Sequence, residues 1–376
     1  MFELVATTLL GIEAITAREL KNLGFEKVKV EDGKVSFWGE ESAIARANLW
    51  LRTAERVLLK IGEFDAHSFD ELYEKTKALS WHEWIPENAA FPVKGYSLKS
   101  ILHSVPDCQS IIKKAVVDNL KNKYHKEWFD ENGPVFRIQF SIMKDHVTLM
   151  IDSSGEALHK RGYRAISNKA PLRETLAAAM IMLSDWRYDR PLLDPFCGSG
   201  TIPIEACLIG LNIAPGLDRE FEAEKWPIFP KKIWWDARKE AHEMIKRGLK
   251  LNITGSDIDN QAVKLAADNA YKAGVDEYIT FKTMPMEAIK PKDKYGCIIC
   301  NPPYGERMGE QKEIEALYKK MGQVFRRLDT WSYYIITAYP DFERLFGKRA
   351  DKNRKLYNGM IKCYYYQYRG PRPPRV

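Results

Sequence analysis

Cysteine is scarce in this chain of 376 residues, and long apolar runs are missing. Six scattered cysteines are too few for the disulfide scaffold of a small secreted protein. No apolar run approaches the roughly 20 residues that a membrane span requires. The opening stretch MFELVATTLLGIEAITAREL carries acidic residues and lacks both a basic leader and a small-residue cleavage site. We therefore expect a folded cytoplasmic protein without membrane association.

A zinc motif and a strong charge of one sign are missing as well. Cys297 and Cys300 form the sequence CIIC, but no second cysteine pair completes a four-ligand site. Two small apolar residues on a buried strand explain this pair, so we expect no metal site. The net charge is only +7, from 58 basic and 51 acidic residues, which permits nucleic-acid binding without demonstrating it. The sequence predicts no particular oligomeric state.

The first part of the chain alternates short strands with amphipathic helices, which is typical of small α+β units. Residues 1–64 predict a ferredoxin-like unit, and residues 65–164 predict a second α+β unit. The expected elements of the first unit are a strand (Phe2–Thr7), a helix (Ile12–Leu23), a hairpin (Val28–Phe37), a helix (Ser42–Trp50) and a strand (Arg56–Phe64). Those of the second are a helix (Ser68–Leu79), a strand ending at Tyr96, a helix (Gln109–Lys123) and two strands (Val135–Ile142 and Val147–Ile151).

The pattern changes in residues 165–376, where a long apolar helix (Leu172–Leu183) precedes strands that are continuously apolar. Such runs are typical of a parallel sheet that is covered on both faces. We therefore expect a doubly wound α/β domain with a mostly parallel sheet. Its predicted strands are Leu192–Asp194, Ile253–Asp257, Cys297–Cys300 and Tyr333–Thr337.

A glycine loop follows the first of these strands, in LLDPFCGSGTIPIEA at residues 192–206. A phosphate-binding P-loop would need lysine after Gly200, and a dinucleotide fingerprint would need a glycine where Pro203 stands. The remaining interpretation is a turn whose backbone approaches another ligand closely at Gly198 and Gly200. Asp194 and Asp257 each end a predicted strand at the ligand-binding edge of the sheet. One could bind a cationic amino-acid group and the other a ribose, which together describe S-adenosylmethionine; the alternative is two helix-capping aspartates.

A second motif, NPPY, follows the strand Cys297–Cys300. Adjacent prolines cannot continue a sheet ladder, and they fix the direction of the Pro302 carbonyl. That carbonyl and the Asn301 amide oxygen could accept both hydrogens of an exocyclic NH2 group on a nucleobase. Tyr304 offers a face on which a base turned out of its helix could stack. Taken alone, Asn301, Pro302, Pro303 and Tyr304 could also form an ordinary turn.

The motifs DPFCGSGTIPIEA, GSDID and NPPYGER, in this order, resemble the class I methyltransferases that modify exocyclic amines. SLKSILHSVPDCQSIIKKAVV and LMIDSSGEALHKRGYR resemble the THUMP-domain branch of that superfamily, once described as N6-adenine DNA methylases. The resemblance spans nearly the whole chain. It implies a ferredoxin-like start, a THUMP domain for RNA at residues 65–164, and a Rossmann-like methyltransferase domain with S-adenosylmethionine as its cofactor.

The resemblance also implies site residues. The cofactor-binding residues expected from it are Asp194, Pro195, Cys197, Gly198, Ser199, Gly200, Asp257 and Ile258, and the catalytic ones are Asn301, Pro302, Pro303 and Tyr304. One position departs from the family pattern. Where an acid often holds the cofactor adenine, this chain has Met284, Pro285 and Met286, and Glu287 follows too late to be assigned that contact.

The expected reaction is methylation of guanine N2 in RNA, with 23S ribosomal RNA as the expected substrate. The alternatives are guanine N2 in tRNA, adenine N6 in DNA or RNA, and a binding protein that has lost catalysis. Glu306 could accept hydrogen bonds from guanine, or it could be a surface or helix-capping residue. Lys160, Arg161 and Arg164 could contact RNA phosphates or form a solvated turn. Aromatic and basic residues alternate around Trp226, Trp234 and Trp235, which suits an RNA-facing flap or, as we favour, the core of the cofactor domain.

Overall fold

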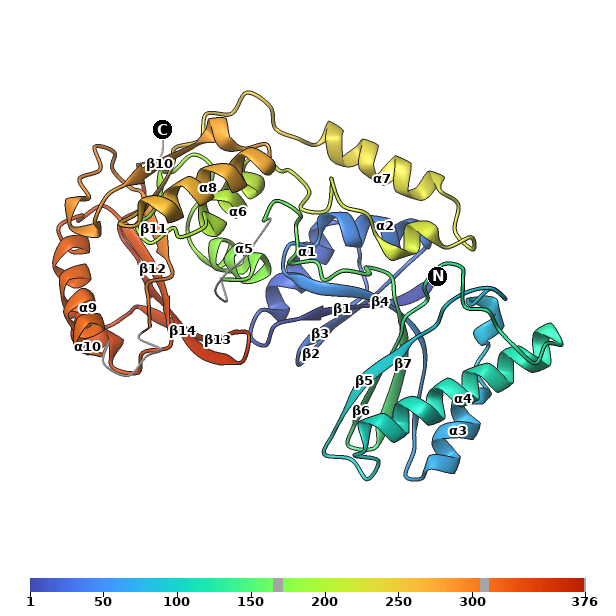
Figure 1. The fold of residues 1–376 in the computed structure, drawn as a ribbon. Coiled ribbons are helices and arrows are strands. Elements are labelled where there is room, and N and C mark those ends of the chain that lie inside the picture. Colours follow the sequence, from blue (N-terminus) through green and yellow to red (C-terminus); the bar gives the residue numbers. More distant parts are fainter. Residues whose placement is uncertain (165–171, 305–310, 375–376) are drawn as a thin grey trace.

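The chain folds around two seven-stranded sheets, one in each half (Figure 1). The computed structural model describes residues 1–164, 172–304 and 311–374. In Figure 1 the N-terminal half lies on the right and the C-terminal sheet lies on the left. Among the described residues, no helix is both long and apolar enough to cross a membrane.

The two N-terminal α+β units share a single sheet, with the strand order β2-β3-β1-β4-β7-β6-β5. Strand β4 joins them, because Leu59 pairs with Leu4 of β1 on one side and with Ile151 of β7 on the other. The sequence predicted two successive units and did not indicate this continuity. The strands are β1 (Phe2–Thr8), β2 (Val28–Glu31), β3 (Lys34–Gly39), β4 (Ala54–Asp65), β5 (Val93–Leu98), β6 (Ile138–Met143) and β7 (His146–Asp152).

The helices of this half all contribute apolar residues to one core cluster on one face of the sheet. They are α1 (Glu13–Asn22), α2 (Glu41–Trp50), α3 (Phe69–Lys77) and α4 (Val105–Tyr124). Each lies where the sequence predicted a helix, although α4 begins four residues earlier than expected. The Ser68 hydroxyl caps α3 by accepting a hydrogen bond from the Glu71 N–H, which explains why that helix starts there.

The C-terminal sheet has the strand order β10-β9-β8-β11-β12-β14-β13. Its first five strands are parallel, whereas β14 is antiparallel to both β12 and β13. The chain runs outward from β8 in one direction and from β11 in the other, so the strand order reverses between these two neighbours. The strands are β8 (Leu192–Asp194), β9 (Ile253–Asp257), β10 (Ile279–Thr283), β11 (Cys297–Cys300), β12 (Ser332–Thr337), β13 (Lys352–Asn358) and β14 (Ile361–Tyr368).

Helices cover both faces of this sheet, so the predicted doubly wound α/β domain is confirmed. One core cluster packs α5 (Glu174–Leu183), α6 (Thr201–Gly210) and α8 (Asn260–Lys272) on one face, and another packs α9 (Gln311–Phe325) and α10 (Phe342–Phe346) on the other. Cys297 and Cys300 are buried in different clusters, on opposite faces of the sheet. They are therefore core residues, as the sequence indicated. Short 3-10 turns are Trp81–Glu83, Glu222–Lys225, Asp276–Tyr278 and Met286–Ala288.

One excursion, containing α7 (Lys232–Glu243), leaves the C-terminal sheet and packs on the N-terminal half (Figure 1). Trp226 stacks on Phe136 with ring centroids 4.5 Å apart, and its indole N–H donates to the Val135 carbonyl at 2.9 Å. Trp234 is buried in the same core cluster. The expectation that these tryptophans cover the cofactor domain is therefore wrong: they complete the core of the other half. Trp235 on α7 is 62% exposed.

Candidate active site

The candidate site lies where β8 and β11 end side by side. Leu192 pairs with Cys297 and Leu193 with Ile298, so the loops after both strands emerge at the same edge. This edge is the point where the strand order reverses, which is where open α/β sheets bind their ligands. Burial raises the pKa of the Cys300 thiol at the end of β11, and Asp194 at the end of β8 raises it further. The structure therefore brings the glycine loop and NPPY together.

The two loop glycines have different tasks. Gly200 has a φ of +83° at the start of α6, and an added Cβ would approach Ala266 of α8 to 3.0 Å. Gly198 has a φ of +50°, and an added Cβ there would meet no atom of the described residues within 4 Å. Gly200 thus lets α6 pack against α8. Gly198 turns the chain where space remains for a ligand.

Asp194 is only 1% exposed, and its carboxylate accepts a hydrogen bond from the Phe196 N–H at 3.1 Å. Burial raises the pKa of this carboxyl well above its usual range, and the nearby Asp257 raises it further. No cationic side chain among the described residues pairs with it. A buried carboxyl in this state favours a ligand that brings its own positive charge.

Asp257 joins the ends of β8 and β9. One carboxylate oxygen accepts from the Gly198 N–H at 3.0 Å, and the other accepts from the Asp259 N–H at 3.0 Å. Asp259 is the residue that caps α8, by accepting from the Gln261 N–H at 2.8 Å. The alternative of two helix-capping aspartates is therefore wrong, because Gly200 precedes α6 and Asp259 precedes α8.

The other expected cofactor residues surround this pair. Pro195 is buried, and the Cys197 N–H donates to the Ser256 carbonyl at 2.9 Å. The Ser199 carbonyl accepts from the Asn269 side chain at 2.9 Å. Ile258, directly after Asp257, is 76% exposed, so this edge of the sheet also presents an apolar side chain to a ligand.

The NPPY loop is anchored by a residue that the sequence did not reveal. Tyr318 of α9 is fully buried, and its hydroxyl donates to the Pro303 carbonyl at 2.8 Å while lying 2.8 Å from the Thr337 hydroxyl of β12. The Tyr304 hydroxyl donates to the Asn301 amide oxygen, and the Tyr304 ring packs partly against the core. Tyr318 occupies an apolar position of an amphipathic helix, so its sequence pattern resembles that of any core residue.

Comparisons with known proteins agree with this geometry. A family model described as the RMKL-like methyltransferase domain matches residues 161–367. The chain belongs to this methyltransferase family. Models of the RlmL ferredoxin-like domain and of the THUMP domain match residues 3–58 and 66–152 of the methyltransferase. The predicted family and fold class are therefore confirmed.

Several relatives resemble the methyltransferase along its whole length. YpsC of Bacillus subtilis (strain 168), provisionally named an RNA methyltransferase, is 51% identical over 98% of this chain and 96% of its own. A structure from Clostridium difficile 630, described as a possible methylase, is 51% identical, covers 100% of both chains and has a TM-score of 0.96. SMU.472, provisionally named a methyltransferase and solved with S-adenosylhomocysteine (SAH), is 44% identical, covers 99% of both chains and has a TM-score of 0.94.

Arg161 and Arg164 of the methyltransferase do not form a phosphate-binding turn. Arg161 is buried and pairs with Glu205 of α6 at 3.3 Å, while Arg164 pairs with Glu174 of α5 at 3.3 Å and donates to the Thr201 hydroxyl. Both alternatives, phosphate contacts and a solvated turn, are therefore wrong for these two residues, because their guanidinium groups tie residues 161–164 to α5 and α6. Lys160 is exposed, and it pairs with Glu156 at 3.1 Å.

Two further acidic residues, Glu287 and Glu306, were considered as ligand contacts from the sequence. Glu287 lies on the surface and pairs with Lys320 at 3.2 Å, so it is engaged by α9. Glu306 lies outside the described residues. Within the described residues, no three metal-ligating side chains gather closely enough to hold an ion.

Proposed function

We propose that this methyltransferase transfers a methyl group from S-adenosylmethionine to the exocyclic N2 of a guanine in RNA, with 23S ribosomal RNA as the expected substrate. The observation that carries the proposal is the meeting of the glycine loop and NPPY at the point where the strand order reverses. The RNA methyltransferase name of YpsC and the THUMP match support RNA as the substrate. The six cysteines are free and buried, which suits the reducing cytoplasm.

The residues at this edge of the sheet fit S-adenosylmethionine, which supplies an electrophilic methyl group. Asp194 would hold the cationic amino-acid end, because it is a buried carboxyl that lacks a cationic partner among the described residues. Asp257 would accept hydrogen bonds from the ribose hydroxyls, since each of its oxygens has a further lone pair. Gly198 leaves room for the backbone to approach the ligand, and Ile258 offers an apolar surface to the adenine. The solved complex of SMU.472 with SAH supports S-adenosylmethionine as the cofactor.

At NPPY the chain orients the target amine rather than deprotonating it. The lone pair of an exocyclic NH2 is delocalised into the base. Two acceptors, the Asn301 oxygen and the Pro302 carbonyl, would hold both hydrogens and favour a pyramidal nitrogen. In the structure the Tyr304 hydroxyl donates a hydrogen bond to the Asn301 oxygen. An arriving base must therefore displace this hydroxyl, which frees the Tyr304 ring for stacking. Once methylated, the nitrogen loses its proton to water, and positioning supplies most of the rate.

The product identifies the base. Guanine presents an N1 donor beside its amine, whereas adenine presents an N1 acceptor, and a pocket that pairs one pattern rejects the other. We expect nucleoside mass spectrometry of RNA treated with this methyltransferase to show N2-methylguanosine, with RNA from a strain lacking the gene as substrate. Treated rRNA and tRNA are digested separately to compare both RNA classes. N6-methyladenosine alone, in RNA or in DNA, would contradict the choice of base. SAH binding without methyl transfer to any nucleic acid would favour the binding-protein alternative.

Tyr318→Phe should lower kcat several-fold while leaving SAH affinity unchanged. The variant removes only the hydroxyl that holds the Pro303 carbonyl, and a misplaced catalytic loop costs rate rather than cofactor binding. Steady-state kinetics and calorimetric titration with SAH measure the two effects. Tyr333→Phe is a matched control, because its hydroxyl donates to carbonyls of Phe325 and Leu328 away from NPPY. An equal loss of kcat in both variants would assign Tyr318 a purely structural role.

A further inference from the structure

The N-terminal sheet carries its helices on one face, and we call the other face the open face because no described helix packs on it. At the centre of the open face, Val5, Leu58 and Met150 form a small buried cluster. Successive strand residues point to opposite faces, and Val57 and Leu59 of β4 join the core beneath the helices. Arg56 and Leu58 therefore point to the other face. Helices α1 to α4 and α7 all contribute to the same core cluster, and no helix of the described chain packs on the open face (Figure 1).

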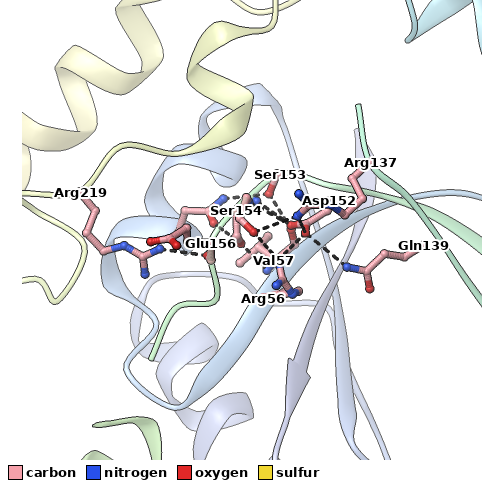
Figure 2. Close-up of polar contacts among 11 residues, drawn as sticks. Arg56, Val57, Arg137, Gln139, Asp152, Ser153, Ser154, Glu156 and Arg219 are labelled. Carbon is pink, nitrogen blue, oxygen red and sulfur yellow. Dashed lines mark hydrogen bonds and ion pairs between the residues drawn. The ribbon is translucent and has the colours of Figure 1, made fainter. Parts of the chain in front are cut away.

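A buried carboxylate organises cations on this open face. Asp152 of β7 is fully buried, and one of its oxygens accepts from the Ser154 and Gly155 N–H groups at 3.0 and 3.2 Å. Its other oxygen accepts from Arg56 at 2.5 Å and from Arg137 at 3.3 Å (Figure 2). Both guanidinium groups also donate to the Gly155 carbonyl. We call Arg56 and Arg137 the arginine pair.

Among the described residues, the arginine pair has positive charge and N–H donors that no protein acceptor uses. Each arginine contacts these protein acceptors through Nη1 alone, and the two side chains are 27% and 29% exposed. One carboxylate faces two guanidinium groups, so a positive charge remains. Arg219 lies beside Glu156 and donates to its carbonyl at 3.0 Å (Figure 2). Burial and repulsion from Arg161 lower the pKa of Arg219 to about 10, so it remains charged at neutral pH.

The same face continues into β6 and β5 with a further cation and an aromatic ring. Gln139 donates to Asp152 at 3.3 Å and pairs in register with Lys94, which is exposed. Two residues along, Tyr96 is 47% exposed. Four neighbouring strands, β4-β7-β6-β5, span about 14 Å at the usual strand spacing. This cationic region of the open face ends toward β1, because Lys60 there already forms ion pairs with Glu3 and Glu63.

We propose that this open face binds a single-stranded segment of the RNA substrate, with the arginine pair and Lys94 on its phosphates and Tyr96 stacked on a base. Cations beside exposed aromatic rings are the combination that holds single strands independently of sequence. The fork of an arginine fits a phosphate in two-point contact, and Asp152 fixes both forks in advance. This inference rests on the proposed function in assuming that the substrate is RNA.

The test compares RNA affinity of full-length variants by filter binding across a salt series. A mixed-sequence single-stranded RNA and a duplex of the same sequence serve as probes. We expect Arg56→Met and Arg137→Met each to weaken single-strand binding about three- to tenfold. Each should also reduce the slope of log affinity against log salt by about 0.7, the value for one phosphate contact on a single strand. Arg137→Lys should restore part of the affinity. Arg187→Met is the control, because Arg187 is 71% exposed and paired with Asp189 in the other half.

Folding is checked by thermal melting, and SAH affinity should stay unchanged in every variant. If removing an arginine beside Asp152 unfolds the protein, the double variant Lys94→Met/Tyr96→Ala tests the proposal instead, because both of its side chains are exposed. We expect it to weaken single-strand binding by the same factor. Affinities that match the control, or an equal loss on the duplex, overturn the inference. A wild-type protein that binds RNA through this face without methylating it would instead contradict the proposed function and leave the surface standing.

Discussion

Asn301→Ala should lower methyl transfer about 100-fold or more while SAH affinity stays close to that of the wild type. The Asn301 oxygen acts on the target amine as it changes shape, so its contribution belongs to the transition state rather than to cofactor binding. Single-turnover transfer of labelled methyl to RNA measures the first effect, and calorimetric titration with SAH measures the second.

A control is needed because the Asn301 oxygen also accepts from the Tyr304 hydroxyl. Tyr304→Phe removes that hydroxyl and keeps the ring for stacking, so it should retain most of the activity. If Tyr304→Phe loses as much activity as Asn301→Ala, the asparagine only holds the tyrosine. Near-complete turnover in Asn301→Ala would remove the residue from the mechanism.

Asp257→Ala should weaken SAH binding about 10- to 100-fold, since losing the acceptor for the ribose hydroxyls costs about 1–3 kcal/mol. The variant also leaves the Gly198 N–H without its partner, which loosens the loop beside the ligand. Calorimetric titration of both proteins gives the difference in affinity.

The neighbouring Asp259 provides the matched control. Its side chain caps α8 and, among the described residues, forms no hydrogen bond with the glycine loop or β8. Asp259→Ala should therefore cost about 1 kcal/mol of stability without changing SAH affinity. Equal affinities for SAH in Asp257→Ala and in the wild type would place the cofactor elsewhere.

The sequence alone predicted those strands and loops of this protein that are determined by residues adjacent in the chain. Apolar runs identified β8, β11 and β12, because strands buried on both faces leave no polar alternation. Gly198, Gly200 and Pro302 predicted the two loops, because the backbone preferences of glycine and proline depend only on the residue itself and its chain neighbours. Because parallel strands end at one edge of a sheet, the residues that follow them could be expected to meet. Their types then indicated cofactor binding and methyl transfer.

Only the tertiary structure decided which distant residues meet. Arg161 and Arg164 look like a surface turn in the sequence. Their carboxylate partners are Glu205, which lies 44 residues after Arg161, and Glu174, which lies ten residues after Arg164. Trp226 belongs by position to the cofactor domain and packs instead on Phe136. Tyr318 and the arginine pair around Asp152 likewise gain their roles from partners on other elements. Side chains become buried or paired when separate elements pack together, and a local sequence pattern does not predict which surfaces will meet.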